Sequence, residues 1–221
     1  MSHSPDLPDQ NQYFDKISSV TSTMGLQLSS DQVLKLLQFV NLLWKWNKAY
    51  NLTSIRDYGQ IFPTHLWDSL VLSDYIEAGT CLDIGTGAGL PGIPLAIVRP
   101  DIQFVLLDSN GKKTRFVQQA KIELGLQNVQ VVHSRVETYQ PDSPFDYLMT
   151  RAVSTIAELT ALSVHLMAAD SRFLFMKSRD VITELEHLPL EYGKTFTSLS
   201  VPDLEAERYL VQVWLKRDST E

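Results

Sequence analysis

The chain has 221 residues, of which 44% are hydrophobic and 20% charged, enough for one α/β domain with a modest extension around a sizeable core. The formal net charge of −7 at pH 7 does not suggest a nucleic-acid partner, so any contact with RNA would have to come from a local basic patch. The single cysteine, Cys81, excludes an internal disulfide framework and a multi-cysteine metal site, and we expect no bound metal.

Residues 1–12 are expected to form a loose tail, and they lack the basic-then-apolar pattern of a secretory signal. No apolar run in the chain reaches the roughly 18 residues that a membrane span needs. We therefore expect a cytoplasmic protein that has no membrane partner and acts as a monomer.

A helical N-terminal extension is expected over residues 13–78. Within it, Ser29 and Gln32 have the spacing of a capping box, which marks the start of a helix. Apolar residues then follow at helical spacing at Val33, Leu36, Leu37, Val40, Leu43 and Trp44. This amphipathic face is expected to pack on the main domain rather than on a partner protein.

Strand-like and helical runs alternate through residues 79–221, which are expected to form one domain. The strand-like runs read CLDIG, QFVLLD, VQVV, FDYLMT, RFLFMK and YLVQVWL. Such alternation with short turns is typical of βαβ units in a parallel sheet. The last run follows no obvious crossover helix and could insert antiparallel. The sequence therefore predicts a Rossmann-like, doubly wound, mostly parallel sheet with an antiparallel last strand.

A glycine-rich loop, residues 83–92, follows the first strand and opens a helix. Its glycines allow a sharp turn and a close approach of the backbone to a ligand. Read from Gly87, the loop matches a dinucleotide fingerprint, with Asp108 at a suitable distance to bind a ribose. Read from Asp83 through Gly85 and Gly87, it resembles the first motif of class I methyltransferases, which bind S-adenosyl-L-methionine.

Two features favour the methyl donor over a dinucleotide. Asp83 can meet a cationic ligand but would repel a pyrophosphate. Pro94 is expected to disturb the helix N-terminus that a diphosphate needs. Asp108 ends the second strand at the ligand edge of the sheet, where its carboxylate can accept both ribose hydroxyls. Val136 and Glu137 follow the third strand, where an adenine edge would lie.

Two features that methylases of other acceptor atoms need are missing from the sequence, which reduces the possible acceptor atoms. The fourth strand is followed by Thr150-Arg-Ala-Val153, not by the Asn/Asp-Pro-Pro-Tyr/Phe motif of exocyclic-amine methylases. Cys81 lies in an apolar strand, which favours a place in the core over a covalent nucleophile. An acceptor that already holds a free lone pair remains, and guanine N7 is the obvious one because it needs no general base.

Basic residues gather in the loops at the same edge of the predicted sheet. Lys112, Lys113 and Arg115 open the helix after Asp108, and Arg135 and Arg151 follow the third and fourth strands. Basic groups at a helix start are poorly placed for the helix dipole, so solvation alone explains the lysines less well. The cluster favours a polyanionic acceptor.

Five stretches of the chain form a specific combination: KWNKAYNLT (45–53), HLWDS (65–69), DIGTGAGLPGIP (83–94), LDSNGK (107–112) and SRVE (134–137). With these residues in hand, the chain closely resembles the bacterial ribosomal RNA small subunit methyltransferase G family, also called glucose-inhibited division protein B. The resemblance runs from about Leu28 to Leu215.

The resemblance implies methylation of guanine N7 at guanine 527, in the 530 loop of 16S rRNA, within the small ribosomal subunit. It also implies roles for individual residues. The S-adenosyl-L-methionine pocket would involve Gly85, Leu90, Asp108, the backbone of Val136 and Glu137, and Arg151. RNA would be met by Lys112, Lys113, Arg135 and Arg208. Near the donor or its lid would lie Asn51, His65 and Asp68, which the residues alone present as helix and cap positions.

Two departures from the family pattern stand out. Thr64 takes the place of a basic residue, and Ser178 takes that of a glycine after Lys177. Neither touches the expected donor site. Two alternatives stay open from the residues alone: an NAD-dependent oxidoreductase, and a donor-binding RNA-interaction module without transferase activity.

Overall fold

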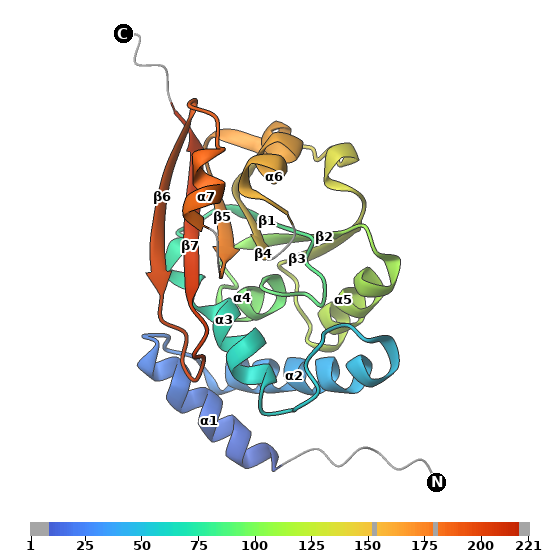
Figure 1. The fold of residues 1–221 in the computed structure, drawn as a ribbon. Helices are drawn as coiled ribbons and strands as arrows, with labels where there is room; N and C mark the ends of the chain where they lie inside the picture. The colour runs from blue at the N-terminus through green and yellow to red at the C-terminus, as the bar shows by residue number, and fades with distance from the viewer. Residues whose placement is uncertain (1–8, 152–153, 179–180, 217–221) are drawn as a thin grey trace.

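The computed structural model describes residues 9–151, 154–178 and 181–216. Its strands are β1 (Thr80–Ile84), β2 (Gln103–Asp108), β3 (Val129–His133), β4 (Phe145–Arg151), β5 (Met167–Lys177), β6 (Tyr192–Leu199) and β7 (Arg208–Leu215). They form a sheet in the order β3-β2-β1-β4-β5-β7-β6 (Figure 1). The first five strands are parallel, and β7 pairs antiparallel with β5 and β6. The predicted mostly parallel sheet with an antiparallel last strand is confirmed.

No pattern in the sequence predicts β6. It lies at the edge of the sheet, and most of its residues are exposed, so it lacks the apolar run that marks the buried strands. Its Gly193 packs on the ring of Trp214 in β7, where a Cβ would overlap the indole. An edge strand of this kind is recognised only once its partner is in place.

Helices cover both faces of the sheet. Their bounds are Gly92–Val98 for α4, Gly111–Glu123 for α5, Ile156–Ser163 for α6 and Val181–Glu186 for α7. Cys81 of β1 belongs to the same buried cluster as α4 and α5, whereas its neighbour Leu82 belongs to the cluster of α6 and α7. Alternate residues of the strand thus face two cores, as expected for a doubly wound sheet.

The N-terminal helices share the first of these cores. The α1 helix spans Gln10–Thr23, so it begins inside the predicted tail, whose residues 1–8 lie outside the described part. The α2 helix spans Ser30–Tyr50 and has the predicted capping box between Ser29 and Gln32. The predicted packing of its apolar face on the main domain is also confirmed, because Val33, Leu36, Leu37, Val40 and Leu43 are buried in the cluster that contains α4 and α5, and the partly buried Trp44 packs against it. In the part of the chain that the structure describes, no helix is long and apolar enough to cross a membrane.

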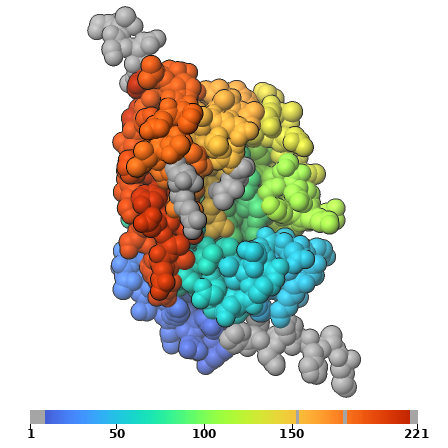
Figure 2. Space-filling view, in the orientation of Figure 1, coloured from blue at the N-terminus to red at the C-terminus, as the bar shows by residue number. Residues whose placement is uncertain are grey.

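Figure 2 shows the N-terminal helices, in blue, lying directly against the C-terminal strands, in red and orange. An ion pair marks this contact: Lys16 Nζ in α1 lies 2.9 Å from Asp203 Oδ2, in the turn between β6 and β7.

The helical pattern expected over residues 13–78 is interrupted after Tyr50 and resumes at Phe62. Asn51 ends α2 in the left-handed conformation, with φ 50° and ψ 52°. An irregular segment then leads to a π-helix (Phe62–Trp67), the short α3 (Asp68–Leu70) and a 3₁₀ turn (Ser73–Tyr75). The buried side chain of Asn47 holds the irregular segment by accepting from Thr53 N at 2.9 Å and donating to Ile55 O at 2.9 Å. Apolar spacing alone does not distinguish this tertiary arrangement from a continuous helix.

Candidate active site

The glycine loop joins β1 to α4 at the carboxyl edge of the sheet. Gly85, Gly87 and Gly89 have φ values of 69°, 60° and 77°, a region in which other residues are strained. At Gly92 the requirement is steric instead, because a Cβ there would overlap Leu106 of β2. The expectation that Pro94 disturbs the helix is wrong. Pro94 lies in the first turn of α4, where its missing N–H would have had no intrahelical partner.

Asp83 lies beneath this loop and is completely buried. Its Oδ2 accepts hydrogen bonds from Thr86 Oγ1 at 2.7 Å and from Gly92 N at 3.0 Å, which ties the two ends of the loop together. Its Oδ1 is buried without a hydrogen-bond partner. Burial raises the pKa of Asp83 to about 7, although its two hydrogen bonds and the charge of Arg151 act in the opposite direction.

Asp108 connects the loops that follow β1 and β2. Its Oδ2 accepts from Gly87 N at 2.8 Å and its Oδ1 from Asn110 N at 2.8 Å. Asn110 in turn caps α5 by accepting from Lys112 N at 2.9 Å. Each carboxylate oxygen keeps a second lone pair, so Asp108 can both hold the loop and accept further hydrogen bonds.

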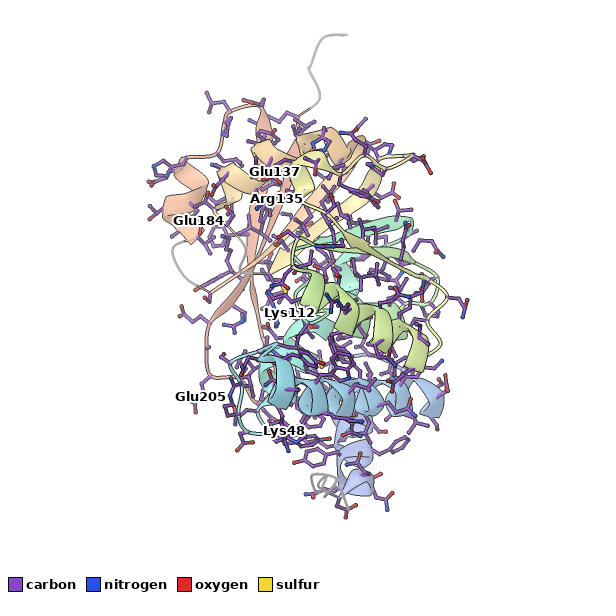
Figure 3. All side chains as sticks on the ribbon, turned by 90° about the vertical axis from the view of Figure 1, so that its right-hand side faces the viewer. Lys48, Lys112, Arg135, Glu137, Glu184 and Glu205 are labelled. Atoms are coloured by element: carbon purple, nitrogen blue, oxygen red, sulfur yellow. The ribbon has the colours of Figure 1, made fainter. Side chains whose placement is uncertain are left out.

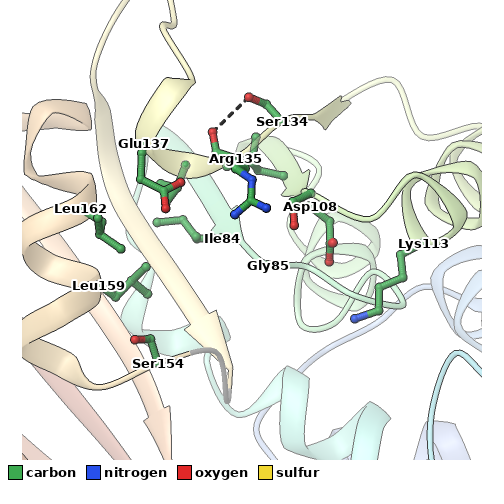
Figure 4. A pocket seen from close by; sticks show the side chains of 13 residues that line it. Ile84, Gly85, Asp108, Lys113, Ser134, Arg135, Glu137, Ser154, Leu159 and Leu162 are labelled. Carbon is green, nitrogen blue, oxygen red and sulfur yellow. Dashed lines mark hydrogen bonds between the residues drawn. The ribbon is translucent and has the colours of Figure 1, made fainter.

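A cavity of about 370 Å³ opens above Asp108, within the range of small-molecule sites (Figure 4). We call it the donor cavity. Asp108 and Lys113 lie on one side of it, Ser154, Leu159 and Leu162 lie on the other, and Arg135 and Glu137 lie between the two sides.

The residues predicted to bind the donor fall into two groups. Gly85, Asp108, Val136 and Glu137 line the donor cavity, as do Lys113 and Arg135, for which the expected role was contact with RNA. Asp83 and Gly87 act on the loop from behind through the hydrogen bonds given above, and Leu90 is 4% exposed in the core next to it. Arg151 lines a different cavity.

That second cavity, of about 240 Å³, lies at the carboxyl ends of β4 and β5, and we call it the acceptor cavity. Its described lining residues are Thr64, His65, Asp68, Arg151, Met176, Lys177, Ser178 and Arg208.

Asp68 lines the acceptor cavity and pairs with two of the arginines in its lining. Its side chain is 2% exposed and bridges two cations: Oδ2 lies 3.0 Å from Arg151 Nη1, and Oδ1 lies 2.7 Å from Arg208 Nε. Arg151 also donates to Thr64 O at 3.1 Å. Three segments far apart in the chain are thus joined by one buried carboxylate.

His65 is held in its neutral form. Its Nδ1 lies 3.0 Å from Thr64 O, and because a carbonyl can only accept, this contact assigns the proton to Nδ1. Its Nε2 then accepts from Thr53 Oγ1 at 2.7 Å, which connects the π-helix to the segment after α2. Burial, followed by the neighbouring charge of Arg151, lowers the pKa of His65 to about 4.

Two further predicted site residues, besides Asp83, Gly87 and Leu90, lie outside both cavities. Asn51 is exposed, and its side chain accepts from Arg56 Nη2 at 2.9 Å. Lys112 is exposed in the first turn of α5. Within the predicted segment after β4, Ala152 and Val153 lie outside the described residues.

Comparison with known proteins shows which family the chain matches. The family model described as rRNA small subunit methyltransferase G matches residues 32–211. The ribosomal RNA small subunit methyltransferase G of Pseudomonas fluorescens (strain Pf0-1) is 45% identical over 202 residues, which cover 91% of this chain and 94% of the relative. The enzyme of the same name from Klebsiella pneumoniae (strain 342) is 44% identical over 90% of this chain and 96% of its own length.

The chain belongs to the rRNA small subunit methyltransferase G family. Solved structures confirm the fold of this family member. The O-methyltransferase TomG from Streptomyces achromogenes, solved in complex with SAM, superposes with a TM-score of 0.59 at 12% identity, over 96% of this chain and 100% of its own. A putative O-methyltransferase from Klebsiella pneumoniae gives a TM-score of 0.59 at 11% identity, over 94% of this chain and 99% of its own.

Sequence reasoning missed several residues that this family member places at the site. Thr53 fixes His65, and Lys177 and Met176 line the acceptor cavity at the end of β5 beside Ser178, which the sequence had marked only as a departure from the family pattern. Glu184 of α7 pairs with Lys177. A signal for Lys177 was present, since a cation at the carboxyl end of a parallel strand lies at the ligand edge of the sheet. Thr53 is the last residue of the stretch KWNKAYNLT that carries the family resemblance, whereas no signal marks Glu184.

Proposed function

We propose that this protein transfers a methyl group from S-adenosyl-L-methionine to N7 of guanine 527, in the 530 loop of 16S rRNA within the small ribosomal subunit. The observation that carries the proposal is the match to the methyltransferase G family over residues 32–211, in a chain whose carboxyl sheet edge holds two neighbouring cavities. One cavity suits a nucleoside-like donor, and the other suits an acceptor base on a polyanionic chain.

The donor cavity fits S-adenosyl-L-methionine in its chemistry. Asp108 offers free lone pairs to the ribose hydroxyls, and Val136 and Glu137 would flank the adenine. Gly85 lets the backbone approach the ligand without a Cβ. The unpartnered Oδ1 of Asp83 lies behind the loop, where a cationic ligand would favour the charged form of this carboxyl group and a pyrophosphate would oppose it. When bound, the donor supplies an electrophilic methyl group on a sulfonium.

The acceptor cavity suits a nucleophile that needs no general base. Both oxygens of Asp68 are engaged by arginines, and both ring nitrogens of His65 are in hydrogen bonds. Among the described residues that line this cavity, these are the groups that could otherwise accept a proton. Guanine N7 carries no proton and attacks with its own lone pair, so the residues have only to orient the base and exclude water.

We further propose that RNA approaches over the face that carries α5. Figure 3 shows Lys48, Lys112 and Arg135 one above another on that face, and each is exposed. Such a local row of cations can bind phosphates although the whole chain carries a net charge of −7. We expect the protein to act as a monomer. We expect it in the cytoplasm, where ribosomal subunits are assembled.

The test is incubation with tritiated methyl donor and small ribosomal subunits from a strain that lacks this protein, followed by nucleoside analysis. Label in 7-methylguanosine supports donor, acceptor atom and substrate class together. Label in another nucleoside would overturn the acceptor. No label on subunits, with donor binding intact by calorimetry, would leave a donor-binding RNA-interaction module. Binding of NAD in place of the donor would support an oxidoreductase.

A further inference from the structure

Lys177 connects the two cavities through a contact that the proposed chemistry does not use. It ends β5, next to the strand that carries Arg151. Its Nζ donates to the carbonyl oxygen of Ser154 at 2.7 Å and lies 2.8 Å from Glu184 Oε2. The side chains of Lys177 and Glu184 are only 11% and 20% exposed, so this ion pair is well shielded from water.

Glu184 extends the contact to the start of α6. Its Oε2 accepts from Ile156 N at 2.8 Å, while its Oε1 accepts from Lys177 Nζ at 3.0 Å. Ile156 is the first residue of α6, and its N–H has no partner within the helix. The carbonyl of Ser154 and the N–H of Ile156 are therefore fixed by two side chains that are themselves paired.

These hydrogen bonds connect residues that line different cavities. Ser154 lines the donor cavity (Figure 4), whereas Lys177 lines the acceptor cavity with Arg151 and Arg208. The bond from Lys177 to Ser154 thus joins a residue that lines one cavity to a residue that lines the other, and we call this contact the shared wall. We propose that Lys177 and Glu184 are a positioning pair that sets the alignment of the acceptor base with the methyl donor. This inference rests on the proposed methyl transfer.

Methyl transfer depends mainly on the alignment of the acceptor atom with the methyl group of the donor. In-line displacement needs the attacking atom and the leaving group on one line at near contact, and a displacement of about 1 Å can cost about 100-fold in rate. A residue that fixes the shared wall should act on kcat, because neither the carboxylate of Asp108 nor the cations that meet RNA are altered. The pair should also act as a unit, since each member holds the other.

The test compares Lys177→Met, Glu184→Gln and the double variant. We expect each single variant to lower kcat by about 10- to 100-fold, with the KM for small subunits and the donor Kd within about threefold of wild type. The double variant should lose no more than the worse single variant. Lys177→Arg, which keeps a cation that can reach both partners, should recover part of the rate.

Lys194→Met is the matched control, because Lys194 Nζ also binds α7, at the carbonyl of Leu185, but lines neither cavity. We expect wild-type kcat for it. Wild-type kcat in Glu184→Gln with a strong loss in Lys177→Met would overturn the pair and make Lys177 a direct contact to the base. Wild-type kcat in both variants, or a donor Kd that rises as much as kcat falls, would also overturn it.

A second readout separates this inference from the proposed function. Amide hydrogen exchange at Ile156 should accelerate more than about tenfold in Lys177→Met and in Glu184→Gln, but not in Lys194→Met. If wild-type protein methylates no subunits, the proposed function fails, and the exchange rates still report whether the pair fixes the wall. Unchanged exchange in both variants would overturn the pair whether or not the enzyme is active.

Discussion

The donor cavity and the acceptor cavity lie side by side at one sheet edge but are assembled in different ways. The loop at the donor side is held by short-range bonds: Asp83 binds Gly92 nine positions on, and Asp108 binds Gly87 across 21 positions. At the acceptor side, Asp68 reaches Arg151 across 83 positions and Arg208 across 140.

The glycine loop at the donor side is held mainly by its own backbone, whereas the acceptor cavity is held by side chains. Backbone N–H groups and glycine conformations shape the donor side, so single substitutions there should act on ligand binding. Buried charges shape the acceptor side, so removal of one charge should act on the stability of the whole domain. The following predictions test that contrast, from the largest expected effect to the smallest.

Asp68→Ala should destabilise the protein most. It removes the shared partner of two arginines whose side chains are only 20% and 18% exposed, and breaking a buried pair costs about 3–5 kcal/mol. Urea denaturation measures the change. Asp31→Ala is the matched control, because Asp31 is 68% exposed in its pair with Lys35 and should cost less than about 1 kcal/mol. Equal losses in the two variants would mean that the network around Asp68 does not hold the acceptor side.

His65 should make stability depend on pH. Its pKa is 6.5 in the unfolded chain and about 4 in the folded protein, so the unfolded state binds more protons between these values. The contribution is fully present above about pH 6.5 and is lost as pH falls toward 4, by roughly 3 kcal/mol in total.

Asp83 makes stability depend on pH in the opposite sense to His65. Its folded pKa of about 7 exceeds the ordinary 3.8, so its contribution to the free energy of unfolding rises as pH falls and the carboxyl group is protonated. The effect of His65 is therefore measured as the difference in unfolding free energy between wild type and His65→Gln across pH 4–7. A difference that stays constant with pH would show that His65 is not held neutral. His187→Gln, at an exposed histidine, is the control.

Asp108→Ala should weaken donor binding by about 10- to 100-fold, since a charged acceptor contributes roughly 1.5–3 kcal/mol. Part of the loss would come from Gly87 N and Asn110 N, which lose their partner. Titration calorimetry with S-adenosyl-L-methionine measures the effect, and Asp101→Ala, at an exposed residue just before β2, serves as control. Wild-type affinity in Asp108→Ala would remove Asp108 from the donor site.

Lys112→Ala should have the smallest effect. It should leave donor binding unchanged and lower the salt slope of RNA binding by about one, because an exposed phosphate contact is lost. Lys113→Ala should alter both quantities, since Lys113 also lines the donor cavity. Lys121→Ala, in the last turn of α5, is the control for the helix. An unchanged slope in Lys112→Ala would mean that this lysine is only solvated.

Much of the donor side could be predicted from the sequence. The strands β1 to β5 and β7, the glycine loop, Asp108 and the capping box at Ser29 all depend on residues close together in the chain, where spacing and local geometry decide the structure. The edge strand β6 could not be predicted, because its pattern is that of an exposed surface until β7 lies beside it.

The sequence by itself determined the fold class and the place of the donor cavity, because alternating apolar runs and a glycine loop specify both within short stretches of chain. Only the tertiary structure decided the acceptor cavity. Asp68, Arg151, Lys177 and Arg208 meet there from four separate segments, and no local pattern records such a meeting. Buried charges need partners wherever the fold provides them, and those partners become visible only when the segments are packed together.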